Sequence, residues 1–209
     1  MTDPNYTHMA FVVDRSGSMH PIQDDMNGAI KQTLTEQDQM PGRLVVDICT
    51  FDSEIDFPYN DATASEVKGD IIEARGTTSL LDAIGLTVTR LGRKLSLMPE
   101  DHRPANVIVV VVTDGQENSS REYTREGIKA MVQEQTDRWG WNFLYLAANV
   151  DAFATGQGMG FGQKMSMGYA ATAGGAQSAY DGISKSASRI RSGGSGAFTD
   201  EEREAAEQS

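Results

Sequence analysis

The sequence predicts a doubly wound α/β fold, in which helices cover both faces of a mostly parallel sheet. Residues 106–113 (NVIVVVVT) form an unbroken apolar run, which is typical of a strand buried on both faces. Similar runs alternate along the chain with stretches that repeat apolar residues every three or four positions, as amphipathic helices do. Two of the runs lead directly into an aspartate, Asp14 or Asp114. These patterns favour a three-layer fold of about six strands with polar side chains at the carboxyl edge of the sheet.

The first half of the chain contains strand and helix patterns in alternation. Pro58 falls in the last predicted strand of this half, and it suits an edge strand because proline has no N–H for the ladder. Pro41 and Gly42 end the first predicted helix. We predict strands over 10–13, 44–51 and 55–59, helices over 21–38 and 79–98, and a weakly patterned short helix over 63–74.

The second half continues the alternation and ends in a polar tail. The glycine-rich stretch 156–162 (GQGMGFG) lacks the spacing of a dinucleotide or phosphate loop, so we do not expect it to bind a nucleotide. Thr199 and Glu202 form a capping-box pair, which indicates a short helix in the tail. We predict the strands 106–113 and 142–148, a short strand within 164–169, helices over 121–139 and 176–191, one domain over 1–192, and a Gly/Ser linker with an acidic tail over 193–209.

Composition limits the classes of function. The formal net charge of −12 repels nucleic acid and anionic membranes, so neither is an expected partner. No apolar stretch has the roughly 18 residues of a membrane span, and the N-terminus lacks the basic region of a signal peptide. The single cysteine, Cys49, sits in an apolar run and reads as a core side chain. We therefore expect a cytoplasmic protein.

The turn after the first strand concentrates oxygen side chains. Asp14, Ser16 and Ser18 occupy alternate positions, and Gly17 allows the backbone to bend so that their oxygens converge. A strand end followed by a helix N-cap would explain one such residue but not three. A carboxylate and two hydroxyls at this spacing predict a site for a hard divalent cation.

Two later segments extend this site if the strands are neighbours. In a doubly wound sheet, ligands bind where adjacent strands send their helices to opposite faces. Asp14 and Asp114 would then face each other across that crevice. Thr77 and Thr78 precede the helix predicted over 79–98, where capping the helix is the competing explanation for either hydroxyl.

These motifs resemble the von Willebrand factor type A domains that carry a metal-ion-dependent adhesion site. The family's D-x-S-x-S pattern appears as Asp14, Ser16 and Ser18. Its threonine loop resembles GTTSLLDAI (76–84), and its Asp-Gly after the central strand appears within VVTDGQENSS (111–120). The closing part, FLYLAANVDAF (143–153) through SRIRSG (188–193), looks like bacterial and phage intracellular members.

The resemblance implies a strand order of 3-2-1-4-5-6 with the third strand antiparallel, and binding of Mg²⁺ or Mn²⁺. Counting back four residues from Asp82 places the family's metal-site threonine at Thr78, with Thr77 where the family often has glycine. It also implies that the hydroxyls of three residues contact the metal, and that two aspartates bind it directly or through water. These expected metal ligands are Asp14, Ser16, Ser18, Thr78 and Asp114.

Three functions fit this sequence. The first is a metal-dependent adaptor that captures an Asp or Glu of a protein partner. Because similar bacterial proteins often work beside AAA+ ATPases, the resemblance implies an AAA+ ATPase or an assembly component as the kind of partner. The second is a structural component of a phage or bacterial assembly that uses the same surface without metal. The third is a metal-dependent hydrolase, which is disfavoured because His8, His20 and His102 form no spaced ligand cluster and Ser16 stands where a dehalogenase-like enzyme needs aspartate. We therefore expect a binding protein and not an enzyme.

Overall fold

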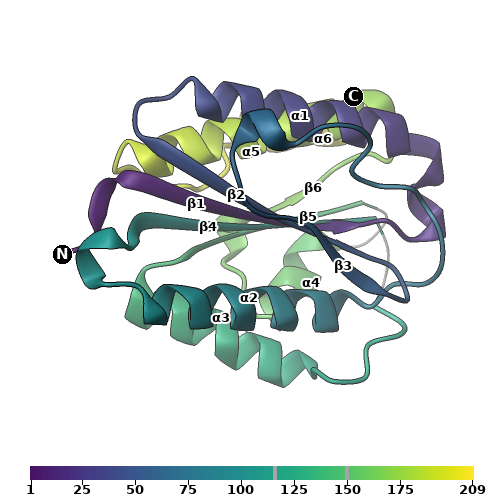
Figure 1. Ribbon diagram of the computed structural model, residues 1–209. Helices are drawn as coiled ribbons and strands as arrows, with labels where there is room; N and C mark the ends of the chain where they lie inside the picture. The colour runs from purple at the N-terminus through teal and green to yellow at the C-terminus, as the bar shows by residue number, and fades with distance from the viewer. Residues whose placement is uncertain (115–116, 149–150) are drawn as a thin grey trace.

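The computed structural model describes residues 1–114, 117–148 and 151–209, and it contains a six-stranded sheet between two layers of helices (Figure 1). The strand order is β3-β2-β1-β4-β5-β6, and only β3 runs antiparallel to its neighbour. The predicted topology is therefore confirmed. The strands are β1 (Asp3–Asp14), β2 (Arg43–Phe51), β3 (Ile55–Ala62), β4 (Pro104–Thr113), β5 (Asn142–Ala147) and β6 (Ser166–Gly168).

The helices divide between the two faces of the sheet (Figure 1). One layer contains α1 (Gln23–Asp38), α5 (Ala173–Arg191) and α6 (Asp200–Gln208), and the other contains α2 (Leu80–Leu97), α3 (Arg125–Trp139) and α4 (Ala152–Gly158). The central strands β1 and β4 are neighbours, with Val13 opposite Val112. The helix after β1 covers one face and the helix after β4 covers the other, so the carboxyl ends of these strands form the switch point of the fold.

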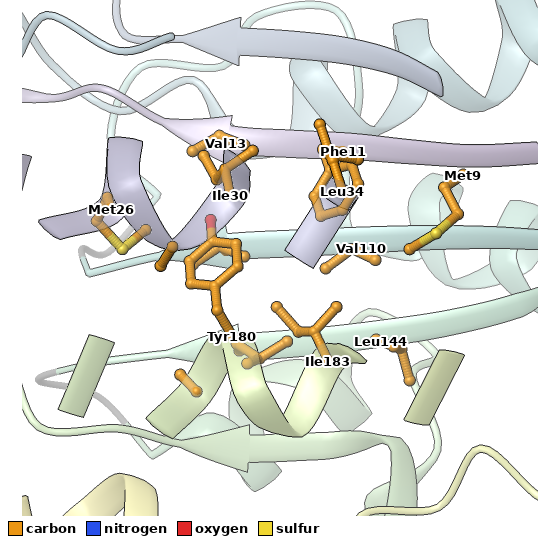
Figure 2. Close-up of a cluster of buried hydrophobic side chains, with 14 of the residues drawn as sticks. Met9, Phe11, Val13, Met26, Ile30, Leu34, Val110, Leu144, Tyr180 and Ile183 are labelled. Carbon is orange, nitrogen blue, oxygen red and sulfur yellow. The ribbon is translucent and has the colours of Figure 1, made fainter. Parts of the chain in front are cut away.

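Apolar side chains on both faces of β1 explain why the sheet is buried. One set faces α1 and α5, where Phe11 and Val13 pack with Ile30, Leu34 and Tyr180 (Figure 2). The alternate positions face α2 and α3 and pack in a second cluster. Because every second residue of a strand points to the same side, an unbroken apolar run supplies both clusters.

Two predicted helices differ from the observed ones. Residues 63–74 contain only a short 3₁₀ turn, Ala64–Glu66, because the buried Asn27 side chain accepts hydrogen bonds from the N–H groups of Ile71 and Ile72 at 2.7 and 2.9 Å. The third α-helix begins at Arg125 instead of residue 121, because the preceding N–H groups bond to Asp82. In both places a side chain from elsewhere takes the backbone groups that a helix would use.

The glycine-rich stretch after β5 forms α4 and a tight turn, and α4 was not predicted from the sequence. Gly160 has a positive φ of 88°, and a Cβ there would lie 2.9 Å from the carbonyl oxygen of Lys129 on α3. This glycine therefore permits a close approach between a loop and a helix.

Residues 193–209, which composition separates from the domain, pack against it in the structure. Phe198 and Ala206 are buried in the same cluster as α1 and α5, and Arg189 forms a two-pronged ion pair with Glu202 at 2.7 and 3.0 Å. The capping box of Thr199 and Glu202 is present, as predicted. The tail therefore adds a helix beside β6.

Both edge strands of the sheet are short or interrupted. The exposed edge strand β3 contains Pro58, and its pairing with β2 shifts register in two places. At the other edge, β6 has three residues, and the Ala170 N–H just beyond it donates to the Ala206 carbonyl of α6 at 2.8 Å. Within the described part of the chain, none of the helices has the length and apolarity that crossing a membrane requires.

Candidate metal centre

Asp14 ends β1 inside the protein, with no exposed surface. Its Oδ1 accepts a hydrogen bond from the Ser16 N–H at 2.7 Å, and its Oδ2 accepts one from the Thr113 hydroxyl of β4. The carboxylate is therefore fixed by its own turn on one side and by the neighbouring strand on the other. Such bonds orient a carboxylate before any ligand arrives.

A chain of hydrogen bonds continues from this turn to Asp114. The Ser16 and Ser18 hydroxyl oxygens lie 3.1 Å apart, and the Ser18 hydroxyl donates to Asp114 Oδ1 at 2.8 Å. The structure thus brings together four of the five ligands predicted from the sequence. Gly115 of the Asp-Gly pair, and Asn149 and Val150 of the 143–153 stretch, lie outside the described residues.

Thr78 reaches the same edge of the sheet on a separate loop. It is 3% exposed, its N–H donates to Asn118 Oδ1 at 3.0 Å, and its carbonyl accepts from the N–H groups of Asn118 and Ser119 at 3.1 and 3.2 Å. The loop also contacts the first turn, where the Gly17 N–H donates to the Gly76 carbonyl at 3.3 Å. These backbone hydrogen bonds of Thr78 go to the loop after β4.

The neighbouring threonine faces another way. Thr77 is exposed, and its hydroxyl donates to the Ser119 hydroxyl at 3.0 Å. Ser119 in turn shares a hydrogen bond with the Ser79 hydroxyl at 2.9 Å. The Thr77 hydroxyl is therefore engaged with the loop after β4.

The hydrogen-bond partners of the two aspartates in the described residues are neutral groups, Ser16 and Thr113 for Asp14 and Ser18 for Asp114. In the described part of the chain, no ion pair with Lys, Arg or His involves Asp14 or Asp114. Burial raises the pKa of the Asp14 carboxyl to about 6, and the charge of Asp114 acts in the same direction against the hydrogen bonds of Thr113 and Ser16. Burial also raises the pKa of Asp114, against the Ser18 hydrogen bond. Two buried carboxylates without a cation favour proton uptake or metal binding.

The donor set fits a hard divalent cation. It offers only carboxylate and hydroxyl oxygens, which Mg²⁺ and Mn²⁺ accept. The described residues contain no cluster of three or more His, Cys, Asp or Glu side chains that could hold a metal, so any site here depends on hydroxyls as well as carboxylates. A divalent cation at this place would balance the charge of both aspartates.

Residues beside the turn have structural roles. Arg15 pairs with Asp52 at 3.2 Å and with Asp56 at 2.6 Å, and Arg75 pairs with Asp52 at 2.8 Å. Met19 is fully buried in the core. The arginines near the turn therefore pair with acidic side chains in and beside the β2–β3 connection, and not with the candidate ligands.

Sequence reasoning missed the residues that hold the Thr78 loop in place. Glu117 accepts the Leu81 N–H, and Asp82 accepts the Arg121 N–H, so each loop binds the backbone of the other. Asn27 and Gln23 of α1 bond to the backbone that leads into Thr78. The polar run ENSS (117–120) directly after the Asp114 segment was the available signal. It did not reveal which backbone groups these side chains would bind.

Solved structures of known proteins share this architecture. Proximal thread matrix protein 1 from the mussel byssus matches with a TM-score of 0.62 and 14% identity, over 88% of this chain and 47% of that one. A crystal structure of the same mussel protein, described as having a zinc-occupied MIDAS motif, matches with a TM-score of 0.58 and 16% identity, over 90% and 46% of the two chains. The ArnB paralog VWA2 from Sulfolobus acidocaldarius matches with a TM-score of 0.53 and 14% identity, over 84% and 44%.

The fold is that of a von Willebrand factor type A domain. The six-strand order with an antiparallel third strand and the shared architecture of these proteins agree on this point. The chain spans about half the length of the mussel and archaeal proteins. No family model and no curated protein matches the sequence. The candidate centre lies at the switch point of this fold, where the Ser18 hydroxyl joins the turn after β1 to Asp114.

Proposed function

We propose that this domain binds a divalent cation through Asp14, Ser16, Ser18, Thr78 and Asp114 and uses it to hold an acidic side chain of a protein partner. The observation that carries the proposal is the chain of hydrogen bonds from Asp14 through both serines to Asp114. It gathers two unpaired carboxylates and two hydroxyls at the switch point of the sheet. That donor set suits Mg²⁺ or Mn²⁺, and zinc at the MIDAS motif of the mussel protein supports a divalent ion in this fold.

The proposed binding of an acidic partner requires a metal ion to offset charge repulsion. The net charge of −12 repels an acidic partner at long range. A cation with one coordination position open to an outside ligand offsets that repulsion, because the carboxylate bonds directly to the ion. The proposed activity is therefore binding and not catalysis, in a cytoplasmic protein of bacterial or phage type, with an AAA+ ATPase or an assembly component as the expected kind of partner.

The first experiment measures the affinity of the protein for divalent metal ions. Calorimetric titration of the protein with MgCl₂, MnCl₂ and ZnCl₂ should show one site per chain. Ser18→Ala should weaken metal binding because it removes a proposed ligand. Ser18 is exposed, so this variant should keep the core intact. A protein that binds none of the three ions would contradict the proposal.

Partner capture follows on the same material. Proteins retained on the immobilised domain in Mg²⁺ should elute with EDTA, and a column of the Asp114→Ala variant should retain none of them. Replacing the responsible Asp or Glu of an identified partner by its amide should have nearly the effect of EDTA. Equal affinity in EDTA and in Mg²⁺ would leave the metal-independent structural role.

A further inference from the structure

The loop after β4 holds the backbone of Thr78 from both sides. Asn118 accepts the Thr78 N–H with its side chain and donates its own N–H to the Thr78 carbonyl, at 3.0 and 3.1 Å. The Ser119 N–H donates to the same carbonyl at 3.2 Å. The N–H and C=O of Thr78 are therefore both bonded to one short segment, which sets the direction in which its side chain leaves the backbone.

The same two loops are joined a second time, independently of Asn118. Glu117 Oε2 accepts the N–H of Leu81 at 2.9 Å. The Asp82 carboxylate accepts three N–H groups, from Arg121, Glu122 and Tyr123, at 2.8, 3.0 and 2.8 Å. Because these bonds keep the loops together, removing only the Asn118 side chain should leave the fold in place. Asn118 itself is exposed, which also limits the cost of removing it.

We propose that Asn118 is a positioning residue for the metal centre, which acts by holding the backbone of Thr78. The proposal rests on the metal binding proposed above. The bonds from Asn118 hold the Thr78 backbone in the β3–α2 connection before any ion is present. Without the side-chain bond, the Thr78 hydroxyl must be ordered when the metal binds, and the affinity falls accordingly.

The first test measures metal affinity by calorimetry with MnCl₂. Asn118→Ala should bind Mn²⁺ about tenfold more weakly than the unmodified protein, which is the usual size of an effect on the residues around a metal ligand. Asn118→Asp keeps an oxygen to accept the Thr78 N–H and should restore the affinity. Asn142→Ala is the matched control. It removes the same type of side chain at the amino end of β5, away from the carboxyl ends of the strands, and should bind Mn²⁺ as the unmodified protein does.

The second test asks whether Asn118 acts through Thr78. In a Thr78→Ala background, Asn118→Ala should have little further effect, because the hydroxyl that it positions is absent. Amide hydrogen exchange in the metal-free protein gives a readout that needs no ion. The Thr78 N–H should exchange faster in Asn118→Ala, and at the unmodified rate in Asn118→Asp and Asn142→Ala.

The outcomes separate this proposal from the one before it. Unmodified protein that binds Mn²⁺ while Asn118→Ala binds it equally well would overturn the positioning role alone. Losses that add fully in the double variant would also overturn it, because they would show that Asn118 acts on something other than Thr78. Unmodified protein that binds no Mn²⁺ would overturn both proposals.

Discussion

The two halves of the candidate centre are built in different ways. Residues 14–18 form a local unit, in which the Ser16 N–H donates to Asp14 and the hydroxyls of Ser16 and Ser18 share a hydrogen bond. Thr78 has no such local support, and it depends on residues 117–119, far away in sequence, and on α1. The comparison teaches that a short motif can encode part of a site, whereas the remainder comes from contacts that only the folded chain brings together.

Removing a carboxylate should have the largest effect, because it takes away negative charge that faces the ion, whether from the local unit (Asp14) or from the end of β4 (Asp114). Asp14→Ala and Asp114→Ala should each lower Mg²⁺ and Mn²⁺ affinity beyond the range of calorimetry, since each supplies half of the negative charge that balances the ion. Circular dichroism should show an unchanged fold, because both residues lie at strand ends. Metal affinity that survives in both variants would remove the site from this edge of the sheet.

The threonine loop should contribute less to metal affinity than the aspartates do, and Thr78 should contribute more than Thr77. Thr78→Ala should weaken metal binding about tenfold, and Thr77→Ala should change it by less than about twofold, because the Thr77 hydroxyl bonds to Ser119. The pair serves as its own control, as both substitutions remove one hydroxyl from the same loop. The reverse order would mean that the loop presents Thr77 to the ion.

The contribution of Asp14 to the stability of the metal-free protein should fall as pH rises. The pKa of Asp14 is raised to about 6 by burial, so its neutral form stabilises the fold fully below the ordinary value near 4, and that contribution is lost as pH rises through about 6. The loss amounts to about 3 kcal/mol of unfolding free energy at most, from roughly two pKa units. Urea unfolding in EDTA between pH 4 and 7 measures it.

Asp14→Asn provides the comparison for that experiment. It removes the titration while keeping an oxygen to accept the Ser16 N–H, so its stability should vary less with pH. Mg²⁺ should restore stability to the unmodified protein near pH 7, because the ion binds only the folded state, and it should lose affinity below about pH 6, where protons compete for the same carboxylate. The same pH dependence in unmodified protein and in Asp14→Asn would contradict the raised pKa of Asp14.

The contacts around the distant half should affect the stability of the fold more than they affect metal binding. Asp82→Asn places an amide N–H against the N–H of Arg121 and should lower the unfolding free energy by about 1–3 kcal/mol, while changing Mn²⁺ affinity only a few-fold. Denaturant unfolding and calorimetry on the same sample separate the two quantities. Asp137→Asn, exposed on α3, should change neither.

The sequence predicted the fold because its buried strands are continuous apolar runs, as in 106–113, and such runs do not depend on context. It also predicted the Asp14–Ser18 turn, whose geometry is local. It did not predict the irregular path of 63–79 or the late start of α3. Asn27 and Asp82 determine those features by binding backbone groups that lie far away in the chain, and no periodic pattern records such a bond.

The edges of the sheet bear on how the protein behaves at high concentration. A free strand edge invites pairing with the edge of another molecule, which is a common first step toward insoluble aggregates. Here Pro58 removes an N–H donor from β3, exposed acidic side chains such as Asp56 flank it, and α6 lies against the short strand β6. The domain should therefore resist aggregation at high concentration. This suits a protein whose proposed partner binds at the carboxyl ends of the strands and not along the edge strands.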